Sequence, residues 1–222
     1  MPLSPKIGHM GRLTTVSPSG PETGRKAAYF ARNRAALIAA TQILLGDKGW
    51  NSTIDEVAEH AGVSVSTVYK HFETKELLFE TCITEAWNDW ETWAFAIVAE
   101  TKDPLEQLVL PMRLMVRTDK THPIFAKMFG TNLGPVADLV PQFTKNLGLH
   151  LRELAKTGVI SIDNSEIRIS NMKAILLRAF QEYIKSPNGK VADADLAIEL
   201  GLPLLGISAA KAKSLMKMPL PI

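Results

Sequence analysis

The sequence predicts an all-α protein. Apolar residues recur at helical spacing along most of the 222-residue chain, and several segments begin with a capping residue and end at a glycine. No run of residues alternates between apolar and polar, as a half-buried strand would. With 46% hydrophobic residues, the chain can bury a sizeable core in one large domain or two small ones.

Charge and cysteine content limit the class of protein. The formal net charge of +2 and the pI of about 8.6 are too mild to identify a nucleic-acid-binding protein by themselves. The single cysteine, Cys82, excludes an internal disulfide framework and fits a reducing compartment. Its helical neighbours favour a packed, inert thiol. No run of 18 or more apolar residues predicts a membrane span, so we expect a cytoplasmic protein.

Residues 1–24 are expected to form a disordered leader. They lack the apolar region of a secretory signal and are interrupted by four glycines and by Pro2, Pro5, Pro18 and Pro21. From Arg25, strong helix formers and a spaced apolar stripe predict a helix that ends near Gly49. Its first turns carry positive charge, which the helix dipole disfavours, at Arg25, Lys26, Arg32 and Arg34. Either an anion lies nearby or this is an ordinary solvated face.

Two short helices follow, each with its own cap. Thr53 and Glu56 form a Thr-x-x-Glu capping box, which predicts a helix that begins at Thr53 and ends at Gly62. Ser64 is the predicted N-cap of the next helix, and Val63 can close on Val68 as a hydrophobic staple. Thr74 can then cap a long helix that runs through the tryptophans at positions 87, 90 and 93.

Two short helices joined by a tight glycine turn predict a helix-turn-helix. Its internal core would consist of Val57, Ala61, Val63 and Val68. In a DNA major groove, small residues at the start of the second helix would let its backbone approach the base edges: Ser64, Val65, Ser66 and Thr67. Tyr69, Lys70 and His71 would reach phosphates on either side. Taken singly, these three residues and Lys75 have ordinary structural interpretations, and only the ordered combination favours DNA binding.

Four segments together resemble the N-terminal signature of the tetracycline-repressor (TetR) family: Thr53–Ala58, Ala61–Ser64, Thr67–Phe72 and Lys75–Leu78. The resemblance implies a three-helix DNA-binding domain over residues 25–75. It implies an all-helical ligand-binding and dimerisation domain over residues 76–222. The function implied is that of a sequence-specific transcriptional regulator of double-stranded DNA, a repressor that a small, mainly apolar effector releases from its operator.

The resemblance also assigns roles to single residues. It implies phosphate contacts for Thr53, Tyr69, His71 and Lys75, with Lys70 touching a phosphate or a base. It implies base-edge contacts for Val65, Ser66 and Thr67, next to the N-cap Ser64, and Thr67 could also bond a phosphate. Ser66 departs from the family, which often has glycine or proline at that position, so it is expected to shape the operator. Asp55 stands where some relatives carry a basic residue, and we expect it to serve the helix dipole or a neighbouring cation instead.

Five more helices are predicted after the long one. The first follows Pro104 and covers Leu105 to Val116. The second begins at Pro123 and ends at Gly130 or Gly134, and the third runs from Pro135 to a stop at Gly158. A fourth begins at Ser165 or Ser170 and runs to Ile184, and the last covers Ala192 to Leu200 and extends to Leu205.

Large, soft apolar residues are unusually frequent in this second part of the chain. They are plain core or the wall of an effector pocket. The predicted ligand-binding set is Trp87, Trp90, Trp93, Met112, Met115, Phe125, Met128 and Phe129, with Phe95 and Phe143 as further members. Arg113, Arg117 and His122 are candidates for orienting a polar end of the ligand, or are solvated.

The last two long helices are expected to form a homodimer interface, as the family's architecture implies. Their apolar stripes could build a four-helix bundle across a two-fold axis from Leu176, Phe180, Ile184, Ala194, Ile198 and Leu202. A dimer is also what a helix-turn-helix protein needs to bind two half-sites.

An enzyme and a protein-interaction module are the alternatives. The five histidines are scattered, without metal-ligand spacing, and no Gly-x-Ser-x-Gly elbow or phosphate-binding glycine loop occurs. We therefore predict no catalytic residue, no metal ligand and no cofactor. The remaining alternative is a helix-turn-helix-derived adaptor that has lost DNA binding and effector control.

Overall fold

A computed structural model describes residues 23–131, 141–186 and 188–222. All the regular elements of these residues are helices, which confirms the predicted all-α class. The expected leader lies outside the described residues, apart from Thr23 and Gly24, which begin the first helix. None of the described helices has the length and apolar character needed to cross a membrane.

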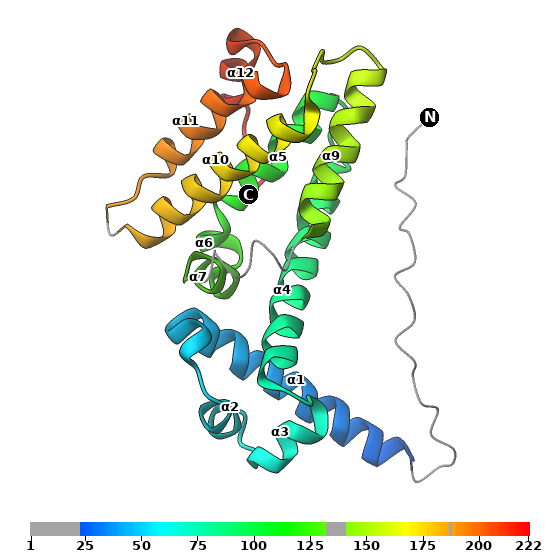
Figure 1. Cartoon of the computed structure of the whole chain (residues 1–222), viewed down its shortest axis with the longest axis vertical. Helices are drawn as coiled ribbons and strands as arrows, with labels where there is room; N and C mark the ends of the chain where they lie inside the picture. Colours follow the sequence, from blue (N-terminus) through cyan, green and yellow to red (C-terminus); the bar gives the residue numbers. More distant parts are fainter. Residues whose placement is uncertain (1–22, 132–140, 187) are drawn as a thin grey trace.

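The N-terminal part is a three-helix unit, drawn in blue and cyan in Figure 1, joined to a long fourth helix. Its elements are α1 (Thr23–Lys48), the 3₁₀ turn η1 (Gly49–Asn51), α2 (Ile54–Ala61), α3 (Val65–His71) and α4 (Lys75–Val98). Fully buried side chains of Leu37, Leu45, Val57 and Val68 form the core between these helices. The predicted stop of α1 near Gly49 is confirmed, since Gly49 has a φ of 61°.

The rest of the chain packs into a larger helical body around the far half of α4 (Figure 1). Its described elements are α5 (Pro104–Met115), α6 (Thr118–Thr121), α7 (Pro123–Thr131), α9 (Pro141–Lys156), α10 (Ser165–Lys185), α11 (Val191–Gly201), η2 (Leu202–Leu205) and α12 (Ala209–Met216). The helix expected from Pro135 begins at Pro141 among the described residues. Two helices were not predicted, the single polar turn α6 and the short C-terminal α12.

The turn between α2 and α3 has the local geometry that its residues predict. The Thr53 side chain accepts a hydrogen bond from the Glu56 amide, and the Glu56 carboxylate accepts one from the Thr53 amide at 2.9 Å, which confirms the capping box. Gly62 ends α2 in the left-handed conformation, with φ 65° and ψ 34°. Ser64 then caps α3 by accepting from the Thr67 amide at 3.3 Å.

The apolar stripes of α10 and α11 face the interior of the same chain. The sequence instead predicts that they face a second copy of the chain in a dimer. Five of the six stripe residues are buried against neighbouring helices of the same chain: Leu176, Phe180, Ala194, Ile198 and Leu202. Gly201 allows the close approach of the two helices, because a Cβ atom there would lie 2.7 Å from the Met172 sulfur. The sixth, Ile184, packs on Gly130 of α7, where a Cβ atom would lie 2.6 Å from its Cγ2. The prediction that these side chains face a partner was wrong, because the stripes form the core of one chain.

Replacement of Gly62 tests whether backbone conformation sets the turn. No atom lies within 4 Å of the position that a Cβ atom would take there, so a new side chain meets no steric obstacle. Gly62→Ala is therefore expected to lower the free energy of unfolding by about 1–2 kcal/mol through left-handed strain alone, measured by urea denaturation. Gly62→Asn should cost less, because asparagine tolerates this conformation. Equal losses for the two variants would mean that another property of glycine matters here.

Candidate functional site

The N-terminal half of α3 presents a small, hydroxyl-rich surface. The hydroxyl of Ser64 lies 2.9 Å from that of Ser66 and 2.9 Å from that of Thr67. The side chains of Ser64 and Ser66 are exposed, while those of Val65 and Thr67 are half-buried. Val68, one turn on, is completely buried and fixes the helix to its unit. The three hydroxyls are therefore held together on a surface that another molecule can reach.

Tyr69 and Lys70 extend this surface at the other end of α3. Tyr69 is 51% exposed although it is a large aromatic residue, and Lys70 is also exposed. Neither the Tyr69 hydroxyl nor the Lys70 ammonium group has a hydrogen-bond partner among the described residues. An unpaired hydroxyl and an unpaired cation beside a hydroxyl-rich helix start suit contacts to phosphate oxygens.

The side chains of Lys75 and Thr53 both make contacts within the chain, in addition to the phosphate contacts predicted for them. The Lys75 ammonium group donates to the Trp50 carbonyl at 2.9 Å and lies 5.0 Å from the centre of the Phe79 ring. The Thr53 hydroxyl accepts the capping bond of α2 but stays exposed. Lys75 therefore has a structural role within the chain, and its phosphate contact remains a prediction.

His71 packs on the start of α1. Its ring lies 3.9 Å from the ring of Phe30, centre to centre. Burial lowers the pKa of His71 below its ordinary value, and the nearby Arg34 cation lowers it further. A neutral imidazole can donate one hydrogen bond to a phosphate, but it brings no positive charge to the surface at neutral pH.

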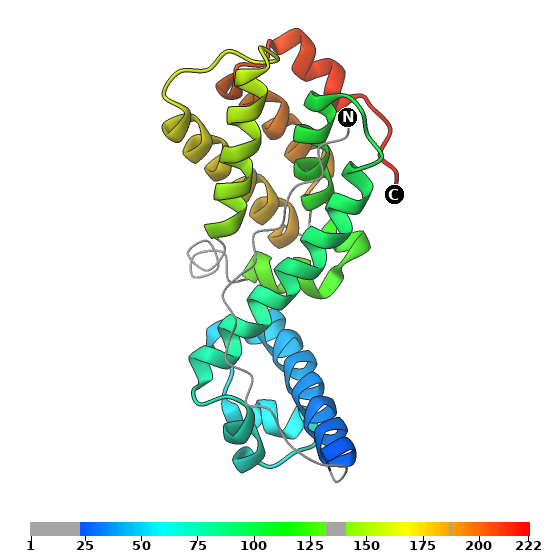
Figure 2. The same ribbon diagram turned by 90° about the vertical axis from the view of Figure 1, so that its right-hand side faces the viewer.

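The first turns of α1 belong to the same surface. Residues 24–32 are all exposed, and in Figure 2 this blue end of α1 lies at the same end of the molecule as α3. The Arg32 guanidinium lies 5.3 Å from the centre of the Tyr29 ring. Sequence reasoning found the basic residues here but missed Tyr29 and Phe30. The signal for these two aromatic residues is their position between the basic residues Lys26 and Arg32 at the start of a helix.

The predicted ligand-binding residues of the second part form a closed aromatic cluster. Phe125 and Phe129 stack with their ring centres 4.1 Å apart, and the Trp87 and Trp90 rings lie 5.3 Å apart. All of the set except the half-buried Trp93 are buried: Trp87, Trp90, Met112, Met115, Phe125, Met128 and Phe129. Phe95 is exposed, and the side chain of Phe143 lies outside the described residues. In this structure the cluster is packed core, and ligand binding there remains a prediction.

The three polar candidates near the cluster have partners within the chain. Arg113 is buried and donates to the carbonyl oxygens of Leu215 at 3.4 Å and Met218 at 2.8 Å. Arg117 forms a two-bonded ion pair with Asp195 of α11. His122 accepts or donates a hydrogen bond at the Thr121 hydroxyl, 3.0 Å away, and its ring meets the Trp93 ring edge-on. The two arginines therefore fix the C-terminal segments. Of the three polar candidates, His122 is the one that lies beside the partly exposed Trp93.

Cys82 is a packed thiol, as predicted. It is completely buried, and burial raises its pKa to about 12, so almost no thiolate exists at neutral pH. Over the described part of the chain, no three His, Cys, Asp or Glu side chains are grouped so that they could hold a metal ion.

The contact between His71 and Phe30 predicts a pH effect. The unfolded chain binds a proton at His71 more readily than the folded chain, so this residue makes the fold less stable as pH falls below about 6.5. Phe30→Ala should expose the imidazole, raise its pKa and reduce that loss, as followed by NMR titration and by urea denaturation at pH 7.5 and 5.5. Tyr29→Ala is the matched control and should leave the pKa of His71 unchanged. An unaltered pKa in Phe30→Ala would assign the shift to Arg34 instead.

The comparisons with known proteins agree with this geometry. Residues 37–82 match the family model described as bacterial regulatory proteins, tetR family. None of the curated protein sequences compared with the chain matches it.

Solved structures share the fold over most of the chain. RolR in complex with resorcinol has a TM-score of 0.70 at 21% identity, over 88% of this chain and 98% of RolR. A TetR family transcription regulator from Marinobacter aquaeolei VT8 has a TM-score of 0.60 at 17% identity, over 80% of this chain and 97% of its own. The fatty acid degradation regulator FadR from Bacillus halodurans has a TM-score of 0.65 at 16% identity, over 78% and 95%. The helix-turn-helix segment of this chain thus matches the tetR family of bacterial regulatory proteins, and the chain shares the fold of a solved TetR family transcription regulator.

Proposed function

We propose that this chain is a sequence-specific repressor that binds operator DNA as a homodimer and leaves it when a small, mainly apolar molecule binds. The exposed face of α3 is the observation that carries the proposal. Ser64, Ser66, Tyr69 and Lys70 are exposed on a helix held in place by the buried Val68. An exposed helix that carries small residues and a cation suits a major groove better than it suits protein packing.

The chemistry of α3 fits base reading at its start and phosphate binding at its end. The Ser66 and Thr67 hydroxyls can donate to or accept from a base edge, and the Val65 methyl groups can contact a thymine methyl group. Tyr69 and Lys70 then reach the backbone. The exposed cations at the start of α1, Arg25, Lys26 and Arg32, add positive potential on the same end of the molecule.

The outward faces of α10 and α11 suit a dimer interface. Three large apolar residues there are strongly exposed: Ile167 at 67%, Leu196 at 52% and Leu200 at 69%. A two-fold arrangement would cover these side chains with a second copy of themselves. It would also supply two α3 helices for two half-sites one turn of DNA apart. We therefore keep the two predicted helices for the interface but assign it to their opposite faces.

Release by a small molecule needs a link between the helical body and α3. RolR, whose fold this chain shares, was solved in complex with resorcinol, which supports ligand control for this chain. α4 provides one link, because it begins next to α3 and carries Trp87 and Trp90 in the body. A ligand that prefers a tilted α4 would alter the spacing of the two recognition helices. Typical coupling of about 1–3 kcal/mol would weaken DNA binding about 5–150-fold.

Selection of bound sequences from a random DNA pool should yield a two-half-site operator. Lys70→Ala should then weaken binding to all DNA sequences, and lower the slope of log affinity against log salt by about 0.9 per protomer, because one phosphate contact is lost. Lys213→Ala, an exposed lysine of α12, is the matched control and should change neither quantity. Ser66→Ala should change the preferred bases while keeping the salt slope.

Binding of no DNA from the pool, at low as well as at physiological salt, would reject the proposed function. The helix-turn-helix would then be a protein-interaction module. An unchanged salt slope in Lys70→Ala would remove this residue from the phosphate contacts and leave the function standing.

The dimer assignment predicts opposite outcomes for two kinds of variant. Leu196→Asp combined with Leu200→Asp should give a folded monomer with sharply reduced operator affinity, because each monomer holds one half-site. Phe180→Asp should instead destabilise the chain itself, because Phe180 is completely buried in its core. Sedimentation and circular dichroism distinguish these outcomes, with Leu149→Asp on the exposed side of α9 as the control. A dimer that survives the double substitution would place the interface on other helices.

A further inference from the structure

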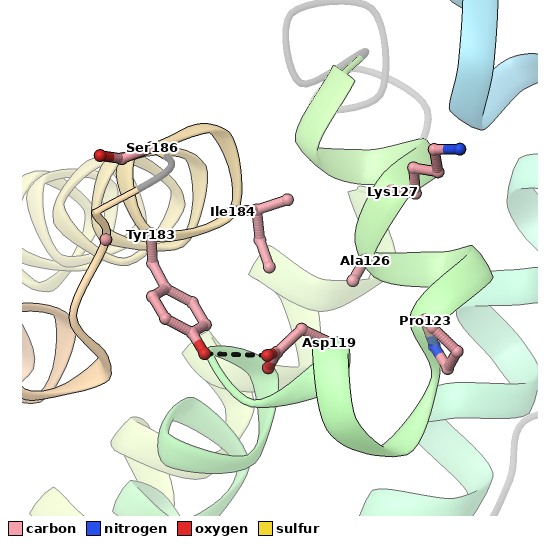
Figure 3. A pocket seen from close by; sticks show the side chains of 8 residues that line it. Asp119, Pro123, Ala126, Lys127, Tyr183, Ile184 and Ser186 are labelled. Carbon is pink, nitrogen blue, oxygen red and sulfur yellow. Dashed lines mark hydrogen bonds between the residues drawn. The ribbon is translucent and has the colours of Figure 1, made fainter.

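A crevice outside the aromatic cluster lies between α7 and the end of α10 (Figure 3). Its volume is about 400 Å³, within the range of about 300–1,000 Å³ that is usual for small-molecule sites. Pro123, Ala126 and Ile184 provide apolar walls, and Asp119 and Tyr183 provide polar groups. None of these residues belongs to the predicted ligand-binding set.

The polar end of the crevice holds one hydrogen-bond acceptor without a partner in the described part of the chain. The Tyr183 hydroxyl donates to Asp119 Oδ2 at 2.9 Å. Burial raises the pKa of Tyr183, and its bond to the Asp119 carboxylate raises it further, so Tyr183 stays a protonated donor. Asp119 Oδ1 is buried and has no hydrogen-bond partner among the described residues. A buried acceptor without a partner is unfavourable, so a small shift of the Asp119 carboxylate that opens Oδ1 to a ligand hydroxyl group would be favoured.

The charges around the crevice are balanced. The Lys120 ammonium group lies 3.3 Å from Asp119 Oδ2, and the Lys127 ammonium group pairs with Asp47 of α1. In Figure 3 the Lys127 side chain points away from the crevice, toward the blue ribbon. A cationic ligand would therefore meet a carboxylate that is already paired, and an anionic ligand would meet the Asp119 charge. A neutral molecule avoids both of these unfavourable interactions.

We propose that this crevice binds a neutral small molecule that carries a hydroxyl group on an apolar ring or chain. The hydroxyl donates to Asp119 Oδ1, and the apolar part lies against Pro123, Ala126 and Ile184. The binding step stands independently of DNA, while its regulatory consequence rests on the proposed function.

The crevice wall also contacts the DNA-binding unit. Besides the pair between Lys127 and Asp47, the Thr131 hydroxyl donates to the Gly46 carbonyl of α1 at 3.2 Å. A Cβ atom at Gly46 would lie 3.3 Å from the Lys127 side chain, so α7 rests directly on α1. On its other side α7 meets α10 at Gly130 and Ile184. A ligand that separates α7 from α10 would therefore displace α1, and with it α3.

The binding step is tested on the full chain with 2-naphthol, and with 2-methoxynaphthalene as a probe of similar shape without the hydroxyl donor. Calorimetry should show that 2-naphthol binds and that the methoxy compound binds at least about tenfold more weakly. Asp119→Asn should lose a similar factor, because the charged acceptor is gone. Ser186→Phe, which fills the crevice from its rim, should abolish binding, whereas Lys185→Phe at the neighbouring exposed position should not.

Three results would overturn the binding step: no binding of 2-naphthol, equal binding of the two probes, or full binding by Ser186→Phe. Circular dichroism of each variant distinguishes a lost site from a lost fold. Because no DNA is present, these results do not depend on whether the chain is a repressor.

The link to α1 is tested by Asp47→Asn combined with Thr131→Val, which cuts both polar contacts and leaves the crevice lining unchanged. This double variant should bind 2-naphthol with the wild-type affinity. The factor by which saturating 2-naphthol weakens operator binding should fall at least about threefold. An unchanged factor, or no effect of bound 2-naphthol on wild-type operator binding, would overturn the link. Failure of the chain to bind any DNA would instead reject the proposed function.

Discussion

The continuous burial of α4, from the three-helix unit into the helical body, is the constraint on which the rest of the structure depends. Leu78, Phe79 and Ile83 of its first half are buried next to the three-helix unit, and Trp87 and Trp90 of its second half are buried in the helical body. A continuous helix of 24 residues is roughly 36 Å long and resists bending, because each turn is hydrogen-bonded to the next. A change of packing at one end is therefore transmitted as a tilt at the other.

α7 adds a second connection, and it differs in kind from the first. One side of α7 contributes Phe125 and Phe129 to the closed aromatic cluster, and another lines the crevice beside Tyr183. Its polar contacts to α1 are an exposed ion pair and a single hydrogen bond, beside the close packing of Lys127 on Gly46, and such polar contacts are weak individually. Weak contacts of this type suit a connection that must break and re-form, whereas the buried cluster suits a fixed support.

Local sequence was sufficient wherever the relevant interactions span three or four residues. The capping box at Thr53, the left-handed Gly62 and the N-cap Ser64 fixed the helix-turn-helix, since each acts on its own or nearby backbone groups. The same locality explains why the exposed small residues of α3 could be predicted. The polar turn α6 was missed because it has no apolar period. The short α12 was missed because only its cap at Ser208 marks its start.

The sequence by itself determined the helical class, the family signature and the exposed, small-residue face of α3. Only the tertiary structure decided which contacts the remaining residues make. Lys75 donates a hydrogen bond to Trp50, 25 positions away, and Asp119 accepts one from Tyr183, 64 positions away. No local sequence pattern can predict contacts between residues so far apart. An apolar stripe such as that of α10 shows that a face is buried, but not whether its own chain or a second one covers it. That choice depends on the packing of distant helices, because hydrophobic burial is not directional and any matching surface satisfies it.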